Sequence, residues 1–227
     1  MKIFILFTVG FAFAWPPTVA AADRSALPEA VRTCAICHNK DGVSKYPNIP
    51  SLAGQKIEYL LKQTTLMADS ARLRLGEISD QEPPTTSSPS GRLTAHRENR
   101  DADRQMAALD EGRILDISVF FASKPRACAQ PAANRSAPPV LVAHCAACHG
   151  QDGVSSDPNV PHLAGQQRFY LLEQFRLFRA TGQELDPTFT QRKRYCPFMS
   201  SQTVLISKEQ MAALATWFAT APCDLKK

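Results

Sequence analysis

The sequence predicts an all-α protein made of two tandem domains related by internal duplication. The first observation is a long repeat: residues 34–38 (Cys-Ala-Ile-Cys-His) recur 111 positions later as residues 145–149 (Cys-Ala-Ala-Cys-His). The second is that each copy alternates stretches of apolar residues at helical spacing with loops rich in Gly and Pro. A chain of 227 residues has room for two small domains of this kind.

The repeat extends well beyond these Cys motifs. The same offset of 111 matches four further pairs of segments: 41–44 with 152–155, 47–50 with 158–161, 52–55 with 163–166, and 59–61 with 170–172. The first, third and fourth pairs are identical, as Asp-Gly-Val-Ser, Leu-Ala-Gly-Gln and Tyr-Leu-Leu. Repetition at one fixed offset indicates that a whole structural unit was duplicated.

Each copy is expected to run as helix, Cys motif, extended loop, helix, variable loop and closing helix. Short helices lead into the motifs over residues 27–34 and 140–145, and longer helices begin at Gln55 and Gln166. The loops between them contain two prolines each, which keeps them out of helical conformation.

The closing helices have clear start signals. In the second copy Ser207, with Gln210 three residues later, forms a capping-box pattern, and Met211 falls on the apolar stripe. In the first copy Asp110 is the expected N-cap, and Ile114 matches Met211. We therefore expect Met211 in the core and not at a ligand site.

Unequal spacing predicts an inserted loop in the first copy. The closing helices match at an offset of 97 instead of 111, so the first copy carries 14 additional residues. These lie within about residues 81–104, where Pro, Ser, Thr and Gly predict a loop. Residues 127–139, rich in Pro and Ala, are expected to form a linker between domains at 22–126 and 140–227.

The first 21 residues have the pattern of a secretory signal peptide. A positively charged start precedes an apolar run over residues 3–15 and small residues at 19–21. The run is short for a membrane span, so an uncleaved anchor is the second choice. We expect an exported protein. Its net charge of +5 is mild and mixed in sign, which gives no nucleic-acid footprint.

The Cys motifs carry the chemistry. C-x-x-C-H is the signature of covalent haem attachment, in which two thiols add to one porphyrin and the adjacent His binds the iron as proximal ligand. The residues concerned are Cys34, Cys37 and His38, and Cys145, Cys148 and His149. A zinc site would bring its Cys pairs about 15 to 20 residues apart, and a thioredoxin-like pair would need a βαβ context; neither is present. We expect two covalently bound haem c groups.

At this point the chain resembles the cytochrome c4 family of diheme c-type cytochromes. The resemblance rests on both Cys motifs, the Leu-Ala-Gly-Gln segments, the Tyr-Leu-Leu helix and the closing aromatic helix, and it covers nearly all of the chain after residue 21. It implies two class I cytochrome c domains related by a pseudo-twofold axis. It also implies electron transfer in the periplasm with redox protein partners, such as a cytochrome c reductase or a terminal oxidase. Association with the membrane surface through such partners is possible. The oligomeric state stays open.

The sixth iron ligand is expected to differ between the copies. Electron-transfer haems usually fill this position with Met or His. In the family the Met precedes the closing helix, where the second copy has Met199. The matching position of the first copy is Ala102, so Met106 is the first candidate there. The alternatives are His96, which would give a bis-His site of lower potential, and Met67 or an open position.

Three cysteines remain outside the motifs, namely Cys128, Cys196 and Cys223. In an oxidising compartment two of them can form a disulfide, but the pairing stays open and one thiol is left over. Cys196 lies three residues before Met199 and is a rival ligand.

The leading functional interpretation is a periplasmic diheme electron carrier of a respiratory chain. The alternative is a diheme enzyme, similar to thiosulfate dehydrogenases or to peroxidases, which would use an open or unusually ligated first haem. The enzyme remains an alternative because position 102, which matches Met199, is an Ala and cannot ligate an iron.

Overall fold

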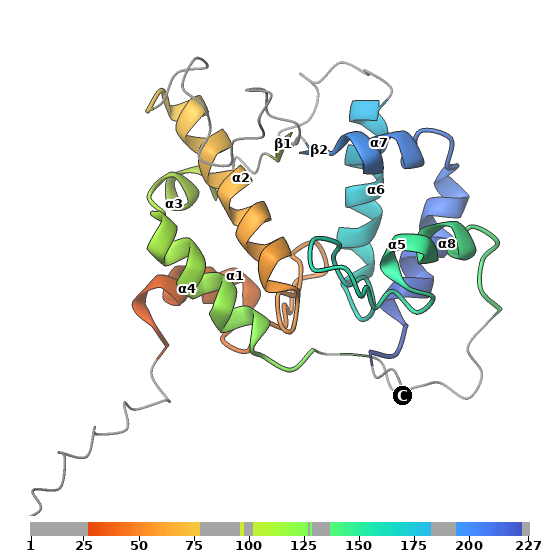
Figure 1. The fold of residues 1–227 in the computed structure, drawn as a ribbon, viewed down its shortest axis with the longest axis horizontal. Coiled ribbons are helices and arrows are strands. Elements are labelled where there is room, and N and C mark those ends of the chain that lie inside the picture. Colours follow the sequence, from red (N-terminus) through yellow and green to blue (C-terminus); the bar gives the residue numbers. More distant parts are fainter. Residues whose placement is uncertain are drawn as a thin grey trace, which may run out of the picture.

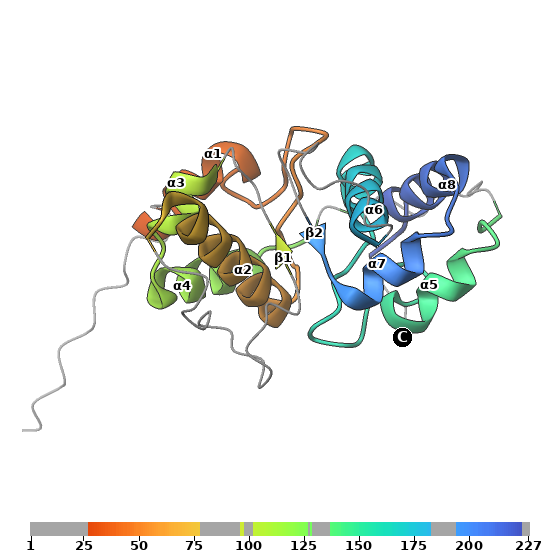
Figure 2. The ribbon, with the colours of Figure 1, turned by 90° about the horizontal axis from the view of Figure 1, so that it is seen from above.

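The computed structural model describes residues 27–77, 96–97, 102–126, 128, 137–182 and 194–223. Two groups of helices, one from each half of the chain, lie side by side (Figures 1 and 2). The first group contains α1 (Glu29–His38), α2 (Ile57–Leu75), α3 (Asp103–Ala107) and α4 (Glu111–Ala122). The second contains α5 (Val142–His149), α6 (Arg168–Gly182), α7 (Pro197–Thr203) and α8 (Lys208–Ala219).

The described part of the chain is all-α, as predicted, apart from one short strand pairing. Strands β1 (His96–Arg97) and β2 (Arg194–Tyr195) pair antiparallel, with Arg97 opposite Arg194. These two arginines are equivalent at the offset of 97. The pairing therefore joins equivalent points of the two repeats, as expected close to a pseudo-twofold axis.

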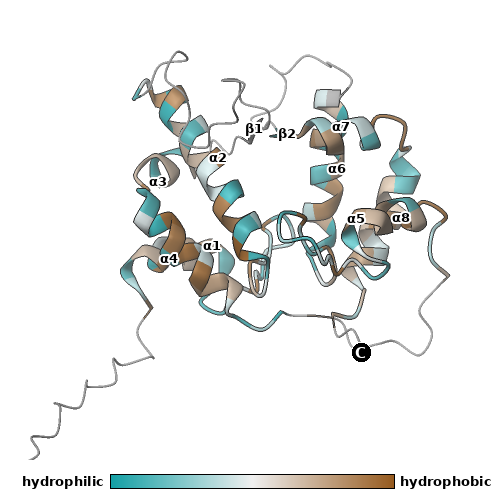
Figure 3. Ribbon diagram, viewed as in Figure 1, coloured by the Kyte–Doolittle hydropathy of each residue, from teal (hydrophilic) through white to brown (hydrophobic). Residues whose placement is uncertain are grey.

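The helices that precede the Cys motifs extend further than expected. α1 runs to His38 and α5 runs to His149, so each motif is the last part of its helix and does not follow it. The longer helices α2 and α6 begin two residues after Gln55 and Gln166. Figure 3 shows polar and apolar residues alternating along α2 and α6, which fits helices with one face in a core.

The closing helices begin where the sequence placed them. The Asp110 side chain accepts a hydrogen bond from the Arg113 amide at 2.7 Å. Ser207 and Gln210 form the complete capping box, with bonds of 3.2 and 2.8 Å. Met211 is 1% exposed, which confirms its assignment to the core.

Each copy has its own core, and the Asp-Gly turn after the motif is locked onto it. Phe121 on α4 and its equivalent Phe218 on α8 are both fully buried. Gly42 and Gly153 have φ of +77° and +79°, and a Cβ there would lie 2.9 and 2.7 Å from these two rings. Glycine is thus required for both the turn and the close approach.

The inserted segment is more structured than the loop expected over residues 81–104. It contains β1, and α3 begins inside it at Asp103. The predicted signal peptide at 1–21 and most of the linker at 127–139 lie outside the described residues. Among the residues that are described, no helix is both long and apolar enough to cross a membrane.

Candidate functional site

The cysteines of the two motifs have matching environments. Cys34 and Cys145 are half-buried against the cores of their domains, whereas Cys37 and Cys148 are exposed. Burial raises the pKa of the Cys34 thiol and of the Cys145 thiol. All four are free thiols. The end of each motif helix therefore presents two thiols, one half-buried and one exposed to solvent.

The histidine of each motif is oriented by one main-chain carbonyl. Nδ1 of His38 lies 2.8 Å from the Pro50 oxygen, and Nδ1 of His149 lies 3.0 Å from the Pro161 oxygen. A carbonyl can only accept, so the neutral ring carries its proton on Nδ1 and its lone pair on Nε2. This is the state and orientation that a haem-ligating histidine needs, and the residues present therefore fit the group.

Electrostatics favour the neutral form of the second histidine. Burial lowers the pKa of His149, the hydrogen bond to Pro161 raises it, and the positive charge of Arg194 lowers it further. A neutral imidazole is the form that binds a metal.

The repeated Asp-Gly-Val-Ser segments hold the motif in place. The Ser44 hydroxyl donates to the Cys37 carbonyl at 3.2 Å, and the Ser155 hydroxyl donates to the Cys148 carbonyl at 2.8 Å. Both serines are buried. These segments therefore serve to fix the C-terminal end of the motif helix.

The distal candidates lie on short helices that pack against the longer ones. Met199 is half-buried on α7, which lies against α6, and Thr181 on α6 hydrogen-bonds Ser200 on α7 at 3.1 Å. Met106 is half-buried on α3, which lies against α2 in the corresponding place. At the offset of 97, Met106 matches Thr203, one helical turn beyond the position of Met199.

Two arginines of α2 hold α3 in that place. Arg72 donates to the carbonyls of Ala107 (3.2 Å) and Leu109, and Arg74 forms a two-bond ion pair with Asp103. The alternative candidate for the first site, His96, lies on β1, where its backbone pairs with that of Tyr195. Its side chain is outside the described part of the structure. The half-buried thiol of Cys196 lies at the N-cap of α7.

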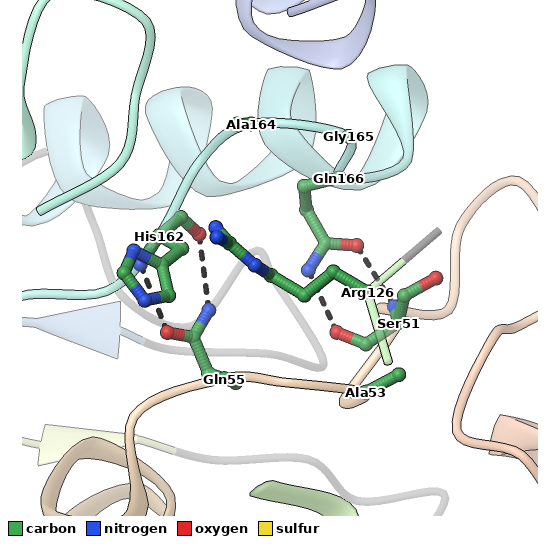
Figure 4. Close-up of a pocket in the computed structure, with 8 residues that line it drawn as sticks. All are labelled: Ser51, Ala53, Gln55, Arg126, His162, Ala164, Gly165 and Gln166. Carbon is green, nitrogen blue, oxygen red and sulfur yellow. Dashed lines mark hydrogen bonds between the residues drawn. The ribbon is translucent and has the colours of Figure 1, made fainter. Parts of the chain in front are cut away.

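Sequence reasoning missed a reciprocal contact between the domains, which Figure 4 shows. The Gln55 amide accepts from the His162 backbone N–H at 2.8 Å and donates to its carbonyl at 3.0 Å. The Gln166 amide makes the same two bonds with Ser51, both at 2.8 Å. Gln55 and Gln166 are equivalent, as are Ser51 and His162, so the contact has pseudo-twofold symmetry. We name these two contacts the glutamine clamps. The Leu-Ala-Gly-Gln repeat marked the two glutamines in the sequence, but not the segments that they contact.

The structure also shows which two of the three cysteines outside the motifs form a disulfide, a choice that the sequence left open. Cys128 and Cys223 form a disulfide, with their Cα atoms 5.4 Å apart, and Cys196 is the thiol left over. Arg126 lies beside this bond and donates to the Cys223 carbonyl at 3.1 Å. Elsewhere in the described residues, no group of three or more His, Cys, Asp or Glu side chains comes together as a zinc site would need.

Known proteins are similar to this chain in sequence and in fold. Residues 139–222 match the cytochrome c family model. The chain is 28% identical over 215 residues to cytochrome c4 of Pseudomonas aeruginosa, covering 87% of this chain and 88% of that protein. It is 23% identical over 232 residues to the thiosulfate dehydrogenase electron acceptor of Thiomonas intermedia, covering 100% and 94%. The structure of reduced recombinant cytochrome c4 from Pseudomonas stutzeri is similar with a TM-score of 0.58 at 23% identity, covering 84% of this chain and 94% of that one.

The helical fold and the paired Cys-His motifs define a c-type cytochrome with two class I domains. Two haem c groups are bound covalently, one for each repeat. More particularly, the protein is a diheme, cytochrome c4-like electron carrier.

Proposed function

We propose that the protein carries electrons in the periplasm between the enzymes of a respiratory chain. The observation that carries this proposal is the duplicated site, in which a motif helix and a carbonyl-held histidine recur with the same geometry in both domains. Haem supplies a one-electron couple at each site. The chain's own residues hold that group, orient its ligands and pack apolar side chains around the site.

The attachment residues follow from this geometry. Cys34 and Cys37 would hold the first haem and Cys145 and Cys148 the second, each through two thioether bonds. His38 and His149 would supply the proximal nitrogen, because their Nδ1 atoms are committed to carbonyls.

The distal ligands are proposed with different support. Met199 is the sixth ligand of the second haem, supported by its half-buried place on α7 before the closing helix. For the first haem we propose Met106, because α3 packs on α2 as α7 packs on α6. His96 is the alternative, and its backbone lies at the strand pairing between the domains.

Carbon monoxide binding tests the carrier against the enzyme alternative. If both irons have six protein and porphyrin ligands, the reduced protein binds carbon monoxide slowly and the oxidised protein shows no high-spin absorption. Fast binding at one haem, or high-spin absorption, would support a peroxidase-like or thiosulfate dehydrogenase-like enzyme instead.

A second candidate function places the same carrier beside a sulfur-oxidising enzyme. It is favoured by the similarity, over the whole chain, to a protein named as a thiosulfate dehydrogenase electron acceptor. Stopped-flow mixing of the oxidised protein with a reduced thiosulfate dehydrogenase, and separately with a reduced cytochrome c reductase, distinguishes the two partners. The physiological donor is the one whose reaction saturates and falls with rising ionic strength.

The proposed location has its own test. In the intact organism, cell fractionation should place the protein in the periplasm, and sequencing of its N-terminus should begin at about residue 22. Recovery with the membrane, with the first residues retained, would instead support the uncleaved anchor.

A further inference from the structure

Each glutamine clamp ends on a peptide group that also holds a motif histidine. The peptide group between Pro50 and Ser51 accepts from Nδ1 of His38 through its carbonyl, at 2.8 Å. Its N–H donates to the Gln166 side-chain oxygen, also at 2.8 Å (Figure 4). One planar peptide group therefore connects the motif histidine of the first domain with a glutamine of the second.

The second domain repeats this connection in the opposite direction. The peptide group between Pro161 and His162 accepts from Nδ1 of His149 through its carbonyl, at 3.0 Å. Its N–H donates to the Gln55 side-chain oxygen of the first domain at 2.8 Å. All of these groups are the equivalents, at the offset of 111, of those in the first connection. We call the two chains of hydrogen bonds the crossed relays.

The hydrogen bonds fix how both glutamine amides are oriented. Their nitrogens donate to the carbonyls of Ser51 and His162, which can only accept, so their oxygens face the N–H groups of the same two residues. Each oxygen also accepts from the N–H of the residue that follows it, at 3.0 Å from Lys56 and 2.9 Å from Gln167. Both glutamines are 8% exposed, so the protein shields these bonds from water.

Hydrogen bonds that follow one another through a peptide group strengthen each other. When the N–H of the group donates to an acceptor, its carbonyl gains negative charge and becomes a stronger acceptor itself. A stronger acceptor at Nδ1 makes a ligating imidazole more basic at Nε2. A more basic ligand stabilises the oxidised iron relative to the reduced iron, and it therefore lowers the reduction potential.

We propose that each clamp glutamine is a positioning residue for the haem of the opposite domain. Gln166 of the second domain acts on His38, and it does so through the peptide group that both contact. Gln55 of the first domain acts on His149 in the same way. This inference rests on the proposed role of the two histidines as proximal ligands. Each haem potential is then set partly by a residue of the other domain, and both depend on the interface.

A redox titration followed by NMR tests the crossed pattern, because each haem is observed through the resonances of its own histidine. In Gln166→Ala the potential of the first haem should rise more than that of the second, and in Gln55→Ala the order should be reversed. The matched control is Gln210→Ala. The Gln210 side chain also accepts from a main-chain N–H at 2.8 Å, but it does so inside the capping box of α8, so both potentials should stay unchanged. Equal rises at the two haems, a larger rise within the same domain, or no rise would contradict the proposal.

The ring protons give a second measurement, which a merely structural role would not move in this pattern. In the reduced protein, the Nδ1–H resonance of His38 should move upfield in Gln166→Ala, because a weaker hydrogen bond shields the proton more. The resonance of His149 should do so in Gln55→Ala. Gln166→Glu keeps an oxygen acceptor for the Ser51 N–H and should keep the His38 resonance at least as far downfield as in the wild type. Unmoved resonances in both alanine variants, or the same upfield movement in Gln166→Glu, would overturn the proposal.

Replacement of the histidines separates this proposal from the one on which it rests. If His38→Ala or His149→Ala leaves the absorption spectrum of its haem unchanged, the assignment of the proximal ligands fails. If both spectra change and the crossed shifts are absent, only the role of the glutamines fails. Should one alanine variant not fold, the other alanine variant and Gln166→Glu still decide.

Discussion

At each proposed proximal histidine, one carbonyl engages Nδ1 and leaves Nε2 free to bind an iron. The contacts of His38 with Pro50 and of His149 with Pro161 are nearly equal in length, at 2.8 and 3.0 Å. The proximal sides of the two sites are therefore alike. The copies differ on the distal side, where Ala102 stands at the position that matches Met199.

Replacing Met199 tests the distal ligand of the second haem. Met199→Ala should abolish the far-red charge-transfer band of one Met-ligated haem and lower that haem's potential, because thioether ligation raises it. The matched control is Met211→Leu, a volume-conserving change at a buried core methionine, which should alter neither property. An unchanged band in Met199→Ala would show that another residue binds this iron, and Cys196 is then the next candidate.

The first haem has two candidate ligands that separate variants can distinguish. If Met106 binds, Met106→Ala converts the first haem to a high-spin or water-bound form, and His96→Ala leaves its electron paramagnetic resonance signal unchanged. If His96 binds, the two results are exchanged and the wild-type potential of this haem is the lower one. Loss of signal in neither variant would rule out both residues.

His162 should make stability depend on pH. Burial, with the charges of Arg126 and Lys56, lowers the pKa of His162 to about 4 in the folded protein. Its ordinary pKa is about 6.5, so as the pH falls from there to about 4 the unfolded chain binds a proton that the folded chain excludes. The free energy of unfolding therefore decreases as the pH falls through this window. In His162→Ser that decrease should be smaller.

The first repeat already has a serine, Ser51, at the position that matches His162. Nδ1 of His162 accepts from the Ser155 amide at 3.1 Å, and in the first repeat the Ser51 hydroxyl accepts from the Ser44 amide at 3.2 Å. Urea unfolding of both proteins at pH 7 and at about pH 4.5 makes the measurement. His144→Ser, at an exposed histidine, is the control. Equal pH dependence in wild type and His162→Ser would contradict the assignment.

Single residues were predictable from sequence where chemistry restricts the residue type. Met211 was placed in the core because its equivalent was Ile114, and its burial confirms this. The roles of the motif cysteines and histidines stay predictions, which rest on the one fixed pattern of haem attachment. The contacts of Arg194 and His162 could not be predicted, because they join segments more than a hundred residues apart in the chain. No local pattern encodes such a contact.

At the scale of elements, the glutamine clamps join the starts of α2 and α6 to the opposite domain. Gln55→Ala and Gln166→Ala each remove two hydrogen bonds to part-buried main chain and should each destabilise the protein by about 1–3 kcal/mol. The double variant should lose less than the sum, because opening one clamp loosens the interface that holds the other.

Chemical denaturation measures these free energies, with Gln151→Ala as control. Gln151 is exposed in a loop of the second repeat, so its truncation should cost little. If Gln55→Ala and Gln166→Ala are no more destabilising than Gln151→Ala, the clamps do not hold the domains together.

Side-chain caps made the starts of the closing helices predictable, whereas the end of α1 was not. Asp110 and Ser207 are side-chain caps, and both closing helices begin directly after them. The end of α1 depends on how the Cys motif packs. The extension of this helix to His38 was therefore missed. The inserted segment was expected to be a loop because its composition is that of one, yet ion pairing with α2 stabilises α3 at its end.

At the scale of the molecule, every described link between the halves joins them at one interface. The strand pairing, both glutamine clamps, the contacts of Arg194 with Tyr59 and Tyr170, and the Cys128–Cys223 disulfide all lie between or beside the two domains. The duplication itself was visible in the sequence, but this interface was not, because a repeat reports what each copy contains and not how the copies pack. This interface therefore holds the two proposed electron-carrying sites in a fixed relation to each other.

The most direct test of the central claim, that the chain holds two such sites, is the intact mass of the protein purified from a host competent for cytochrome maturation, compared with Cys34→Ala/Cys37→Ala and Cys145→Ala/Cys148→Ala double variants. The account predicts a wild-type mass greater than that of the polypeptide by two haem groups, and greater by one haem group in each double variant. A wild-type protein carrying one haem or none, or a double variant that keeps both, would contradict it.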